Sequence, residues 1–498
     1  MASPWFAIAH TPPSRGEGRS RCCFGLKRSG SKRVACSVRL GSSLVPRSAV
    51  AGISWPAIPG VAAARLLALQ QQLEHSQWWP RERIEAHQFR QLGRLLDHAF
   101  ASVPHYRRFL AAVGYRPGRV VTPEWLRALP ILTRRDVQDA GAQLLSAAIP
   151  PEHGKRESTA TSGSTGMPVT VVKTELEQIY WQAITLRHSL WHRRDPRLKL
   201  AAIRSDRSGR SDYPHGSRQA DWGPPLADVF GTGPAALLDI RTGIAEQVEW
   251  LAREDPDYLL SFGTNLLFLA RHFRETGIPL PRLKAVIASG EIVESELRRL
   301  SRDVWGVPLS DMYSAVEVGY IALQCPEREH YHVQMEAAVV EVLDPQGNPC
   351  EPGEIGEVVV TPLHNYATPL IRYALGDYAE VGEPCSCGRG LTVLRRIVGR
   401  ARDMVVLPTG ERRFGYHSPD LLAGLAPIVQ HQIAQTSRDE LEIRLVVRRP
   451  LTPEEEATVI ALVNANYGGG FRCRIGYRDE IARADGGKYF VFRSELPA

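Results

Sequence analysis

The segment from Thr161 to Pro168 is rich in residues that suit an anion. Hydroxyl side chains alternate with glycines there, immediately ahead of a strand-like run over 169–172. Glycine lets backbone N–H groups turn toward a phosphate, and Ser and Thr hydroxyls add further donors. The pattern predicts a phosphate cradle, although a plain Ser/Gly turn explains the composition equally well. It is not a P-loop, because no Gly-Lys-Ser/Thr closes it.

Two acidic positions follow short apolar runs further along the chain. Gly290 and Glu291 come directly after the expected strand 285–288, at a turn of the kind where open α/β sheets bind ligands. Tyr313 precedes Glu317 by four residues, so its ring could stack on a base while the carboxylate holds a divalent cation. Core packing beside a surface acid explains this second pair equally well.

A third acidic position stands after a glycine in a basic stretch. Asp377 follows Gly376 in the run that begins at Arg372, and Arg400 lies downstream in Gly399-Arg400-Ala401-Arg402-Asp403. A carboxylate after a tight glycine turn could accept both hydroxyls of a ribose. A solvated turn acid is the alternative.

Cysteines and histidines in two short segments could hold a metal ion. Three thiols and one imidazole form a Cys₃His set suited to tetrahedral Zn²⁺, namely Cys325, His332, Cys385 and Cys387. His330 is an alternative ligand, and Cys350 could compete for the ion. Reduced cysteines without a metal are the other reading.

The net charge of +7 is distributed very unevenly. Residues 1–60 hold nine basic residues and one acidic residue, a balance of +8, so residues 61–498 carry about −1. Nucleic-acid binding by the main part of the chain therefore has little support. The first 60 residues are expected to be disordered, either as a transit-peptide-like segment or as an untypical start of the reading frame.

Composition limits the class of protein further. Hydrophobic content of 43% over 498 residues is ordinary for a globular protein of several domains. The longest apolar stretches, such as 61–69, are far short of the roughly 20 residues that span a bilayer. Eight scattered cysteines favour a reducing, cytoplasmic setting over a disulfide framework.

Hydrophobic spacing predicts an α/β architecture. Leucines recur at helical spacing over 61–115, and from about residue 160 short apolar strands alternate with helices. Strands are expected at 199–203, 258–260, 284–288, 337–343 and 356–362. From about Arg400 a smaller α+β unit follows, with strands at 403–407, 430–435, 441–448 and 471–477 and helices at 418–425 and 453–467.

The order of these motifs resembles the adenylate-forming enzymes, and within them the phenylacetate–CoA ligase family with its capsular-biosynthesis relatives. The motifs that carry the resemblance are Thr-Ser-Gly-Ser-Thr-Gly, Tyr-x-x-x-Glu, Arg-Tyr-x-x-Gly-Asp, Gly-Arg-x-x-Asp and a late Gly-Lys. It covers about residues 61–498. It implies an adenylation domain of several subdomains over 61–399 and a small mobile α+β domain over 400–498.

The resemblance also implies a reaction and a role for each matching residue. Such enzymes use Mg-ATP to convert a carboxylic acid to an acyl-adenylate, release pyrophosphate, and usually pass the acyl group to coenzyme A. Gly290 and Glu291 should line the adenine pocket with Tyr313 against the base, and Glu317 should hold Mg²⁺. Asp377 should bind the ribose, Arg400 should brace the nucleotide, and Lys488 should be the adenylation lysine. The β- and γ-phosphates should be wrapped by Ser162, Gly163, Ser164, Thr165 and Gly166.

Three departures from the family pattern bear on the second step. Met167 replaces a lysine often seen in the phosphate loop, Leu375 replaces a threonine, and Arg402 stands where an acid is common. The hinge of the mobile domain is expected at Arg402 or Asp403. An amine, hydroxyl or carrier thiol therefore stays open as acceptor in place of coenzyme A, as does adenylyl transfer.

The expected partners are a small carboxylic acid and coenzyme A, with no nucleic acid and no membrane, and a homodimer stays open. A non-catalytic nucleotide-binding homologue is the remaining alternative. Retention of Lys488 argues against it, because a protein that only binds nucleotide does not need this lysine.

Overall fold

The computed structural model describes residues 44–160, 169–206, 208–415, 421–422, 424–483 and 489–496, with only the backbone of Arg402. These residues belong to one compact unit. Its strands form two large sheets, one four-stranded sheet and two hairpins among the described residues. The mixed α/β class predicted from the hydrophobic spacing is confirmed.

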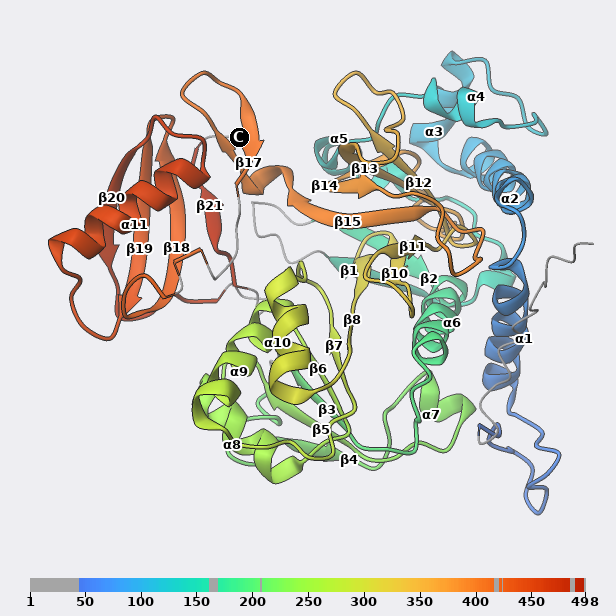
Figure 1. Cartoon of the computed structure of the whole chain (residues 1–498). Coiled ribbons are helices and arrows are strands. Elements are labelled where there is room, and N and C mark those ends of the chain that lie inside the picture. The colour runs from blue at the N-terminus through green and yellow to red at the C-terminus, as the bar shows by residue number, and fades with distance from the viewer. Residues whose placement is uncertain are drawn as a thin grey trace, which may run out of the picture. The chain divides into compact units, whose positions relative to one another are not determined.

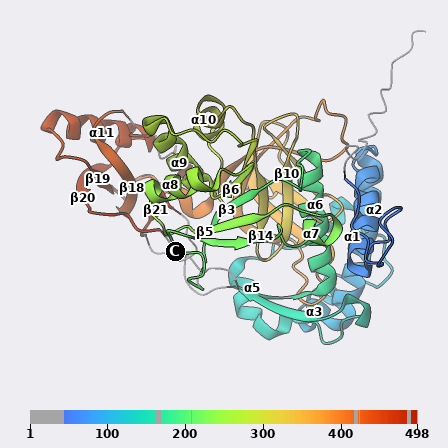
Figure 2. The ribbon, with the colours of Figure 1, turned by 90° about the horizontal axis from the view of Figure 1, so that it is seen from below.

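The second and third helices pack on each other, and the first packs on a later long helix. Pro80 and Pro104 punctuate the leucine-rich stretch, as expected, and α6 lies beside α1 (Figure 2). The helices are α1 (Val61–Ser76), α2 (Arg81–Ser102), α3 (Pro104–Ala112), α4 (Pro123–Arg127), α5 (Arg134–Ala140) and α6 (Glu175–Trp191).

Residues 44–60 correct the expectation of disorder up to residue 60. Arg47 N donates to Val229 O at 2.7 Å, and Pro46 forms a bridge with Phe230. Leu44 packs against the cluster around Phe230 and Leu226. This segment is therefore attached to the folded part of the chain by backbone pairing and apolar contact, which its Ser/Gly/Pro-rich composition does not reveal.

The first large sheet has six strands in the order β4-β5-β3-β6-β7-β8 and is parallel except at β4 (Figure 1). Apolar faces of its helices bury Val248, Leu266 and Leu297 against the sheet. Its strands are β3 (Leu200–Arg204), β4 (Ser217–Gln219), β5 (Ala235–Asp239), β6 (Tyr258–Ser261), β7 (Ala285–Ala288) and β8 (Leu309–Ser310). Its helices are α8 (Ile244–Glu254), α9 (Gly263–Thr276) and α10 (Ser295–Trp305), whereas the short α7 (Leu226–Val229) packs on α1.

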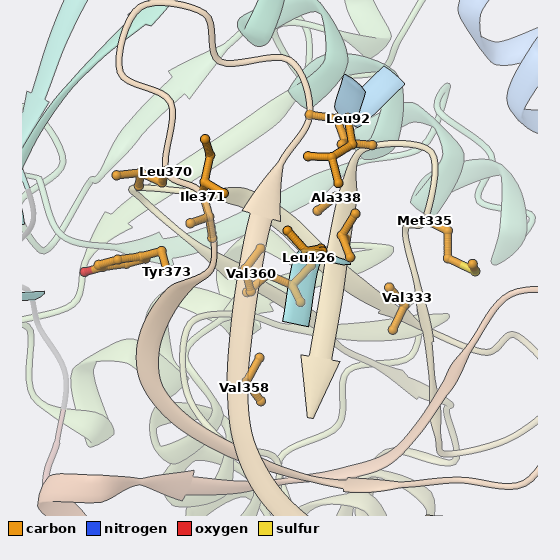
Figure 3. Packing of buried hydrophobic residues seen from close by; sticks show 14 of the residues in the cluster. Leu92, Leu126, Val333, Met335, Ala338, Val358, Val360, Leu370, Ile371 and Tyr373 are labelled. Atoms are coloured by element: carbon orange, nitrogen blue, oxygen red, sulfur yellow. The ribbon is translucent and has the colours of Figure 1, made fainter. Parts of the chain in front are cut away.

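The second large sheet is antiparallel, has seven strands, and holds the main core. Leu92 of α2 and Leu126 of α4 pack with Val358 and Val360 of this sheet (Figure 3). The strand order is β12-β13-β14-β15-β11-β10-β9. The strands are β9 (Met312–Ala315), β10 (Gly319–Gln324), β11 (Tyr331–Val333), β12 (Ala338–Leu343), β13 (Ile355–Pro362), β14 (Tyr373–Val381) and β15 (Val393–Arg400).

The remaining strands form a hairpin, whose two strands flank the expected cradle residues, and the sheet of the C-terminal α+β unit. The hairpin pairs β1 (Arg156–Ala160) with β2 (Thr170–Thr174). The C-terminal sheet has the order β20-β19-β18-β21. It packs on one helix, and that helix begins with a capping box formed by Thr452 and Glu455. Its elements are β18 (Ile428–Ser437), β19 (Glu440–Val447), β20 (Arg472–Tyr477), β21 (Phe492–Ser494) and α11 (Pro453–Asn466). A second hairpin, β16 (Met404–Val406) with β17 (Arg412–Phe414), precedes it.

One expected helix of this unit is not found among the described residues. Leu421, Leu422, Gly424 and Leu425 lie in turns, whereas a helix was predicted over 418–425. Gly424 has a φ of +79°, a left-handed conformation that does not continue an α-helix.

No helix in the part of the chain that the structure describes is long and apolar enough to cross a membrane.

Arg372 ties the helical region to the second sheet. Its guanidinium is buried, lies 3.0 Å from Glu341 on β12, and donates to the carbonyls of Arg127 and Leu129 at the end of α4. Its backbone adopts φ +53°, an uncommon conformation for a residue other than glycine. We assign this residue a structural role.

The Arg372→Ala variant is expected to lower the free energy of unfolding by about 3–5 kcal/mol, because it leaves the carboxylate of Glu341, whose side chain is only 12% exposed, without its ion-pair partner. Denaturant unfolding measures this loss. Arg299→Ala is the matched control, since Arg299 pairs with Asp303 on the surface and should cost less than about 1 kcal/mol. Equal losses in the two variants would contradict the role assigned to Arg372.

Candidate active site

A hydrogen-bonded group of Tyr313, Asp377 and Arg400 forms the centre of the candidate site. Tyr313 Oη donates to Asp377 Oδ2 at 2.8 Å, and Arg400 Nε lies 3.0 Å from Asp377 Oδ1. β9 and β14 are separated by three strands in the sheet order. A flat sheet would hold two such strands about 19 Å apart, so the sheet must curl to bring these side chains together.

Asp377 is buried inside β14, not on a solvated turn as one reading of the sequence allowed. Gly376 before it has a φ of +73°, and the pairing of β14 with β13 shifts register in this region. Oδ1 forms the ion pair with Arg400 but accepts no hydrogen bond from the described residues. A buried carboxylate oxygen without a donor is suited to accept one from a ligand hydroxyl.

The charges of this group act on one another. Burial raises the pKa of Tyr313 well above its usual value, and the negative charge of Asp377 raises it further. The pKa of Arg400 is raised chiefly by the attraction of Asp377. Tyr313 therefore stays a neutral donor and Arg400 a cation over the whole physiological range.

Glu317 lies in the turn between β9 and β10 and is buried at 8% exposure. Its negative charge contributes to the raised pKa values of Tyr313, Tyr373 and Arg400, after larger causes in each case. Its carboxylate has no hydrogen-bond or ion-pair partner within the described ranges. A buried carboxylate of this kind is suited to an oxygen-preferring cation.

Glu291 follows β7, and its carboxylate points to two segments of the chain. Oε2 accepts from Thr264 N at 2.9 Å and from Thr264 Oγ1 at 2.6 Å, at the start of α9. Oε1 accepts from Tyr489 N at 3.1 Å. Gly290 before it has a φ of +75°, which accounts for glycine at this turn. The expected roles of Gly290 and Glu291 at an adenine pocket stay predictions.

The expected phosphate cradle, Ser162 to Gly166, and Lys488 lie outside the described residues. Their chain neighbours are described. Ala160 pairs with Thr170 across the β1–β2 hairpin, so the cradle residues connect the two strands of a tight pair. Tyr489, next to Lys488, is buried and is held by Glu291.

The expected hinge segment follows the Arg400 side of the site. The short 3-10 helix Ala401–Asp403 follows β15, and Asp403 Oδ2 accepts from Arg400 N at 3.1 Å. A single short turn thus connects a residue of the candidate site to the C-terminal unit. This connection is consistent with a hinge at Arg402 or Asp403, which stays a prediction.

The cysteines and histidines singled out in the sequence come together at a second place. Sulfur and nitrogen atoms of Cys325, His330, His332 and Cys385 all lie within 4.8 Å of one another. Cys325 Sγ and Cys385 Sγ are 3.9 Å apart, and Cys387 Sγ is 3.4 Å from His332 Nε2. Neither Cys350, which could have competed, nor Cys387 of the predicted set is a member of this group, which includes His330, the alternative ligand.

These distances fit a tetrahedral zinc site. Two ligand atoms bound to zinc at about 2.3 Å for sulfur and about 2.0 Å for nitrogen lie about 3.8 Å apart for two sulfurs and about 3.5 Å for sulfur and nitrogen. Hydrogen bonds from Cys325 and then His332 lower the pKa of Cys387, whereas the hydrogen bond with Cys387 raises the pKa of Cys325 and burial raises the pKa of Cys385. Arg389 lies between the rings of Trp78 and Trp191, at 4.6 and 4.5 Å, and adds a positive charge nearby.

The sequence reasoning missed several residues around Glu291 and one beside the cysteine group. Thr264, Asn265, Arg483 and Tyr489 surround Glu291, and Arg389 borders the cysteine group. They lie on helices and irregular segments without a recognisable spacing. Only Arg389, which stands directly after Cys387-Gly388, had a neighbouring motif that could have drawn notice.

The fold is that of the adenylate-forming CoA ligases. The structure of 2-hydroxyisobutyryl-CoA ligase in the postadenylation state, with 2-HIB-AMP, matches with a TM-score of 0.66 at 18% identity, over 84% of this chain and 91% of that one. The same enzyme in its thioesterification state, with 2-HIB-AMP and CoA, matches with a TM-score of 0.54 at 20% identity, over 84% of this chain and 91% of that one.

In sequence the chain is similar to the phenylacetate–CoA ligases, which confirms the resemblance drawn from the motifs. The Thermus thermophilus enzyme is 27% identical over 389 residues, 75% of this chain and 84% of that protein. The Escherichia coli K12 enzyme is 26% identical over 342 residues, 66% of this chain and 73% of that protein. No protein-family model matches the chain.

Proposed function

We propose that this protein is an AMP-forming acid–thiol ligase that converts a carboxylic acid to its acyl-CoA thioester. A carboxylate oxygen attacks the α-phosphorus of ATP, the bond between the α- and β-phosphates breaks, and pyrophosphate leaves. The thiol sulfur of coenzyme A then attacks the acyl carbon of the adenylate, and AMP leaves. The observation that carries the proposal is the buried Asp377 carboxylate with an oxygen that has no donor, in a fold shared with acyl-CoA ligases.

In the first step, different residues of the chain bind the ribose, the phosphates and the substrate carboxylate. Asp377 accepts the ribose hydroxyls through Oδ1, while Tyr313 and Arg400 fix its orientation. Arg400 also offsets negative charge next to the phosphates. The hydroxyls and backbone of 162–166 bind the β- and γ-phosphates, and Lys488 bridges the substrate carboxylate and the α-phosphate, where charge develops in the transition state.

Glu317 is the residue that we propose to hold Mg²⁺. It is buried and lacks a protein partner among the described residues, so a bound cation would compensate its charge. When bound, Mg²⁺ neutralises charge on the phosphates during their displacement. Glu317 would hold that cation through its carboxylate oxygens.

We infer that the C-terminal unit rotates about the Arg400–Asp403 turn between the two steps, because one short turn connects it to the candidate site. A cytoplasmic setting is consistent with the described cysteines, which are free thiols.

Product analysis tests the proposal. The protein is incubated with Mg-ATP, coenzyme A and aryl or short-chain carboxylic acids, and AMP and acyl-CoA are quantified by mass spectrometry. Equimolar AMP and acyl-CoA is the expected result. AMP or acyl-adenylate without a thioester would favour a different acceptor, such as an amine, hydroxyl or carrier thiol, and would contradict the second step.

We further propose that Cys325, His332, Cys385 and Cys387 hold a structural zinc ion, with His330 within reach as an alternative ligand. The Cys385→Ser/Cys387→Ser variant is expected to lose about one zinc per chain and to unfold at a lower temperature, because zinc binding contributes to folding. Elemental analysis and thermal unfolding measure both effects.

Cys473→Ser is the matched control for the zinc variant. Cys473 lies on β20, outside the group, and its replacement should leave the zinc content unchanged. An unaltered zinc stoichiometry in the double variant would refute the site.

A further inference from the structure

The order of strands in the six-stranded sheet reverses between β3 and β6, which are parallel neighbours. From β3 the chain passes to β4 and β5 on one side, and from β6 it passes to β7 and β8 on the other. In open α/β sheets, ligands bind in the crevice that such a reversal leaves outside the carboxyl ends of the strands. Arg204 is the last residue of β3, and Ser261 is the last residue of β6. Arg204 therefore stands at the edge of the sheet where a ligand is expected.

The guanidinium of Arg204 pairs with no carboxylate of the described residues, and none of them acts on its pKa. By contrast, Arg241 at the same edge, just after β5, has its Nε 2.9 Å from Asp239 Oδ1. Arg204 is exposed to solvent, yet desolvation by the surrounding protein lowers the pKa of its guanidinium. The two observations together place this cation where protein surrounds it and a solute can still reach it.

Tyr320 on β10 is the group of the second sheet that acts on this cation. The phenol raises the pKa of Arg204, and the guanidinium lowers the pKa of Tyr320, in each case after larger causes. Tyr320 stands three residues after Glu317 and pairs with Ser314, the neighbour of Tyr313. The electrostatic contact therefore connects Arg204 to the strand pair that carries part of the candidate active site.

We propose that Arg204 binds a second carboxylate of the substrate acid, so that the acid activated by this protein is a dicarboxylate. The inference rests on the proposed function, because it concerns the acid of that reaction. A desolvated guanidinium is costly unless an anion pairs with it, and its planar fork matches a carboxylate through two parallel hydrogen bonds. The proposed function assigns other groups to the ribose and the phosphates, and none to the part of the acid remote from the activated carboxylate.

Substrate pairs that differ in one charge test the inference. Succinate, glutarate, adipate and terephthalate are each compared with the corresponding monoamide, which keeps the length and shape of the acid but has a single carboxylate. Acid-dependent ATP–pyrophosphate exchange is the first readout. The second is binding of each acid measured by calorimetry in the presence of α,β-methylene-ATP, which cannot release pyrophosphate.

Three variants are measured with both readouts. Arg204→Ala removes the cation, and Arg204→Lys keeps a positive charge without the planar fork. Arg197→Ala is the matched control, because Arg197 lies before the opposite end of β3 and pairs with Asp195 on the surface. Circular dichroism checks the fold of each variant.

The wild-type protein is expected to use at least one dicarboxylate about tenfold or more better than its monoamide, as judged by kcat/KM. Arg204→Ala should lose about 10- to 100-fold with that dicarboxylate, because a hydrogen-bonded pair of charges is lost. With the monoamide it should stay within about twofold of the wild type, and its KM for ATP should be unchanged. Arg204→Lys should recover part of the loss, and Arg197→Ala should change neither acid.

Three results would overturn the inference. One is a wild-type protein that prefers no dicarboxylate over its monoamide. Another is an equal loss with both acids of a pair in Arg204→Ala, which would place the residue at the activated carboxylate or give it a purely structural role. The third is a raised KM for ATP with every acid, which would place Arg204 at the phosphates.

Failure of the proposed function has a different outcome. If the wild-type protein exchanges with no acid, the proposed function fails, and calorimetry then decides whether Arg204 binds an anion. Binding of a dicarboxylate that is lost in Arg204→Ala would support the anion site, whereas binding that is absent or unaffected by the substitution would refute it.

Discussion

The Glu317→Gln variant is expected to lose about 100-fold or more in ATP–pyrophosphate exchange while keeping its fold. The substitution preserves the shape of a buried side chain but removes the negative charge that we propose to hold Mg²⁺. Losing one electrostatic contact to the transferring phosphate costs about 10²–10³ in kcat. Titration of exchange activity with Mg²⁺ should also show a higher half-saturating concentration.

Glu357→Gln is the matched control for this variant. Burial raises the pKa of Glu357 on β13, but this residue is outside the group around Asp377. Its replacement should leave exchange within about twofold, because it touches no proposed ligand. If Glu317→Gln keeps wild-type exchange and wild-type Mg²⁺ dependence, the cation role of Glu317 is wrong.

The Lys488→Ala variant is expected to lose about 10²–10³ in the rate of acyl-adenylate formation, because it removes a cation from charge that develops in the transition state. ATP affinity should change much less, since the base, ribose and terminal phosphates are bound by other residues. Single-turnover formation of AMP from ATP and acid measures the step directly, and circular dichroism checks the fold.

Thioester formation distinguishes Lys488 from a general structural lysine. Lys488→Ala, supplied with a preformed acyl-adenylate and coenzyme A, should still form the thioester at a substantial rate. Lys284→Ala is the control, because Lys284 is an exposed lysine at the start of β7. Retained adenylation in Lys488→Ala would refute the role taken from the Gly-Lys motif.

Local patterns predicted much of the fold. Short apolar runs at 258–260 and 356–362 became β6 and β13, and the helical spacing over 453–467 became α11. β6 and β13 are buried along most of their length, as continuous apolar runs predict, and α11 buries Val459 and Val463, which lie one helical turn apart. Prediction failed where long-range contacts decide the structure, as at 44–60, which pairs with Phe230 far along the chain.

The candidate site was predictable in its members and not in its geometry. The motifs identified Tyr313, Asp377 and Arg400, but no local rule indicates that a curled sheet joins the Tyr313 hydroxyl to Asp377. The spacing of Glu291 likewise suggested a ligand pocket, whereas its contacts with Thr264 and Tyr489 depend on how distant segments pack. The cysteine group was predictable because metal ligands have strict chemistry and short spacings.

The ligase assignment is tested most directly by acid-dependent ATP–pyrophosphate exchange with the wild-type protein, screened over aryl and aliphatic carboxylic acids in the presence of Mg²⁺. Exchange that requires a particular acid, and formation of the matching acyl-CoA when coenzyme A is added, is the predicted result. Normal ATP binding without exchange for any acid would contradict the assignment and favour a nucleotide-binding homologue without catalytic activity.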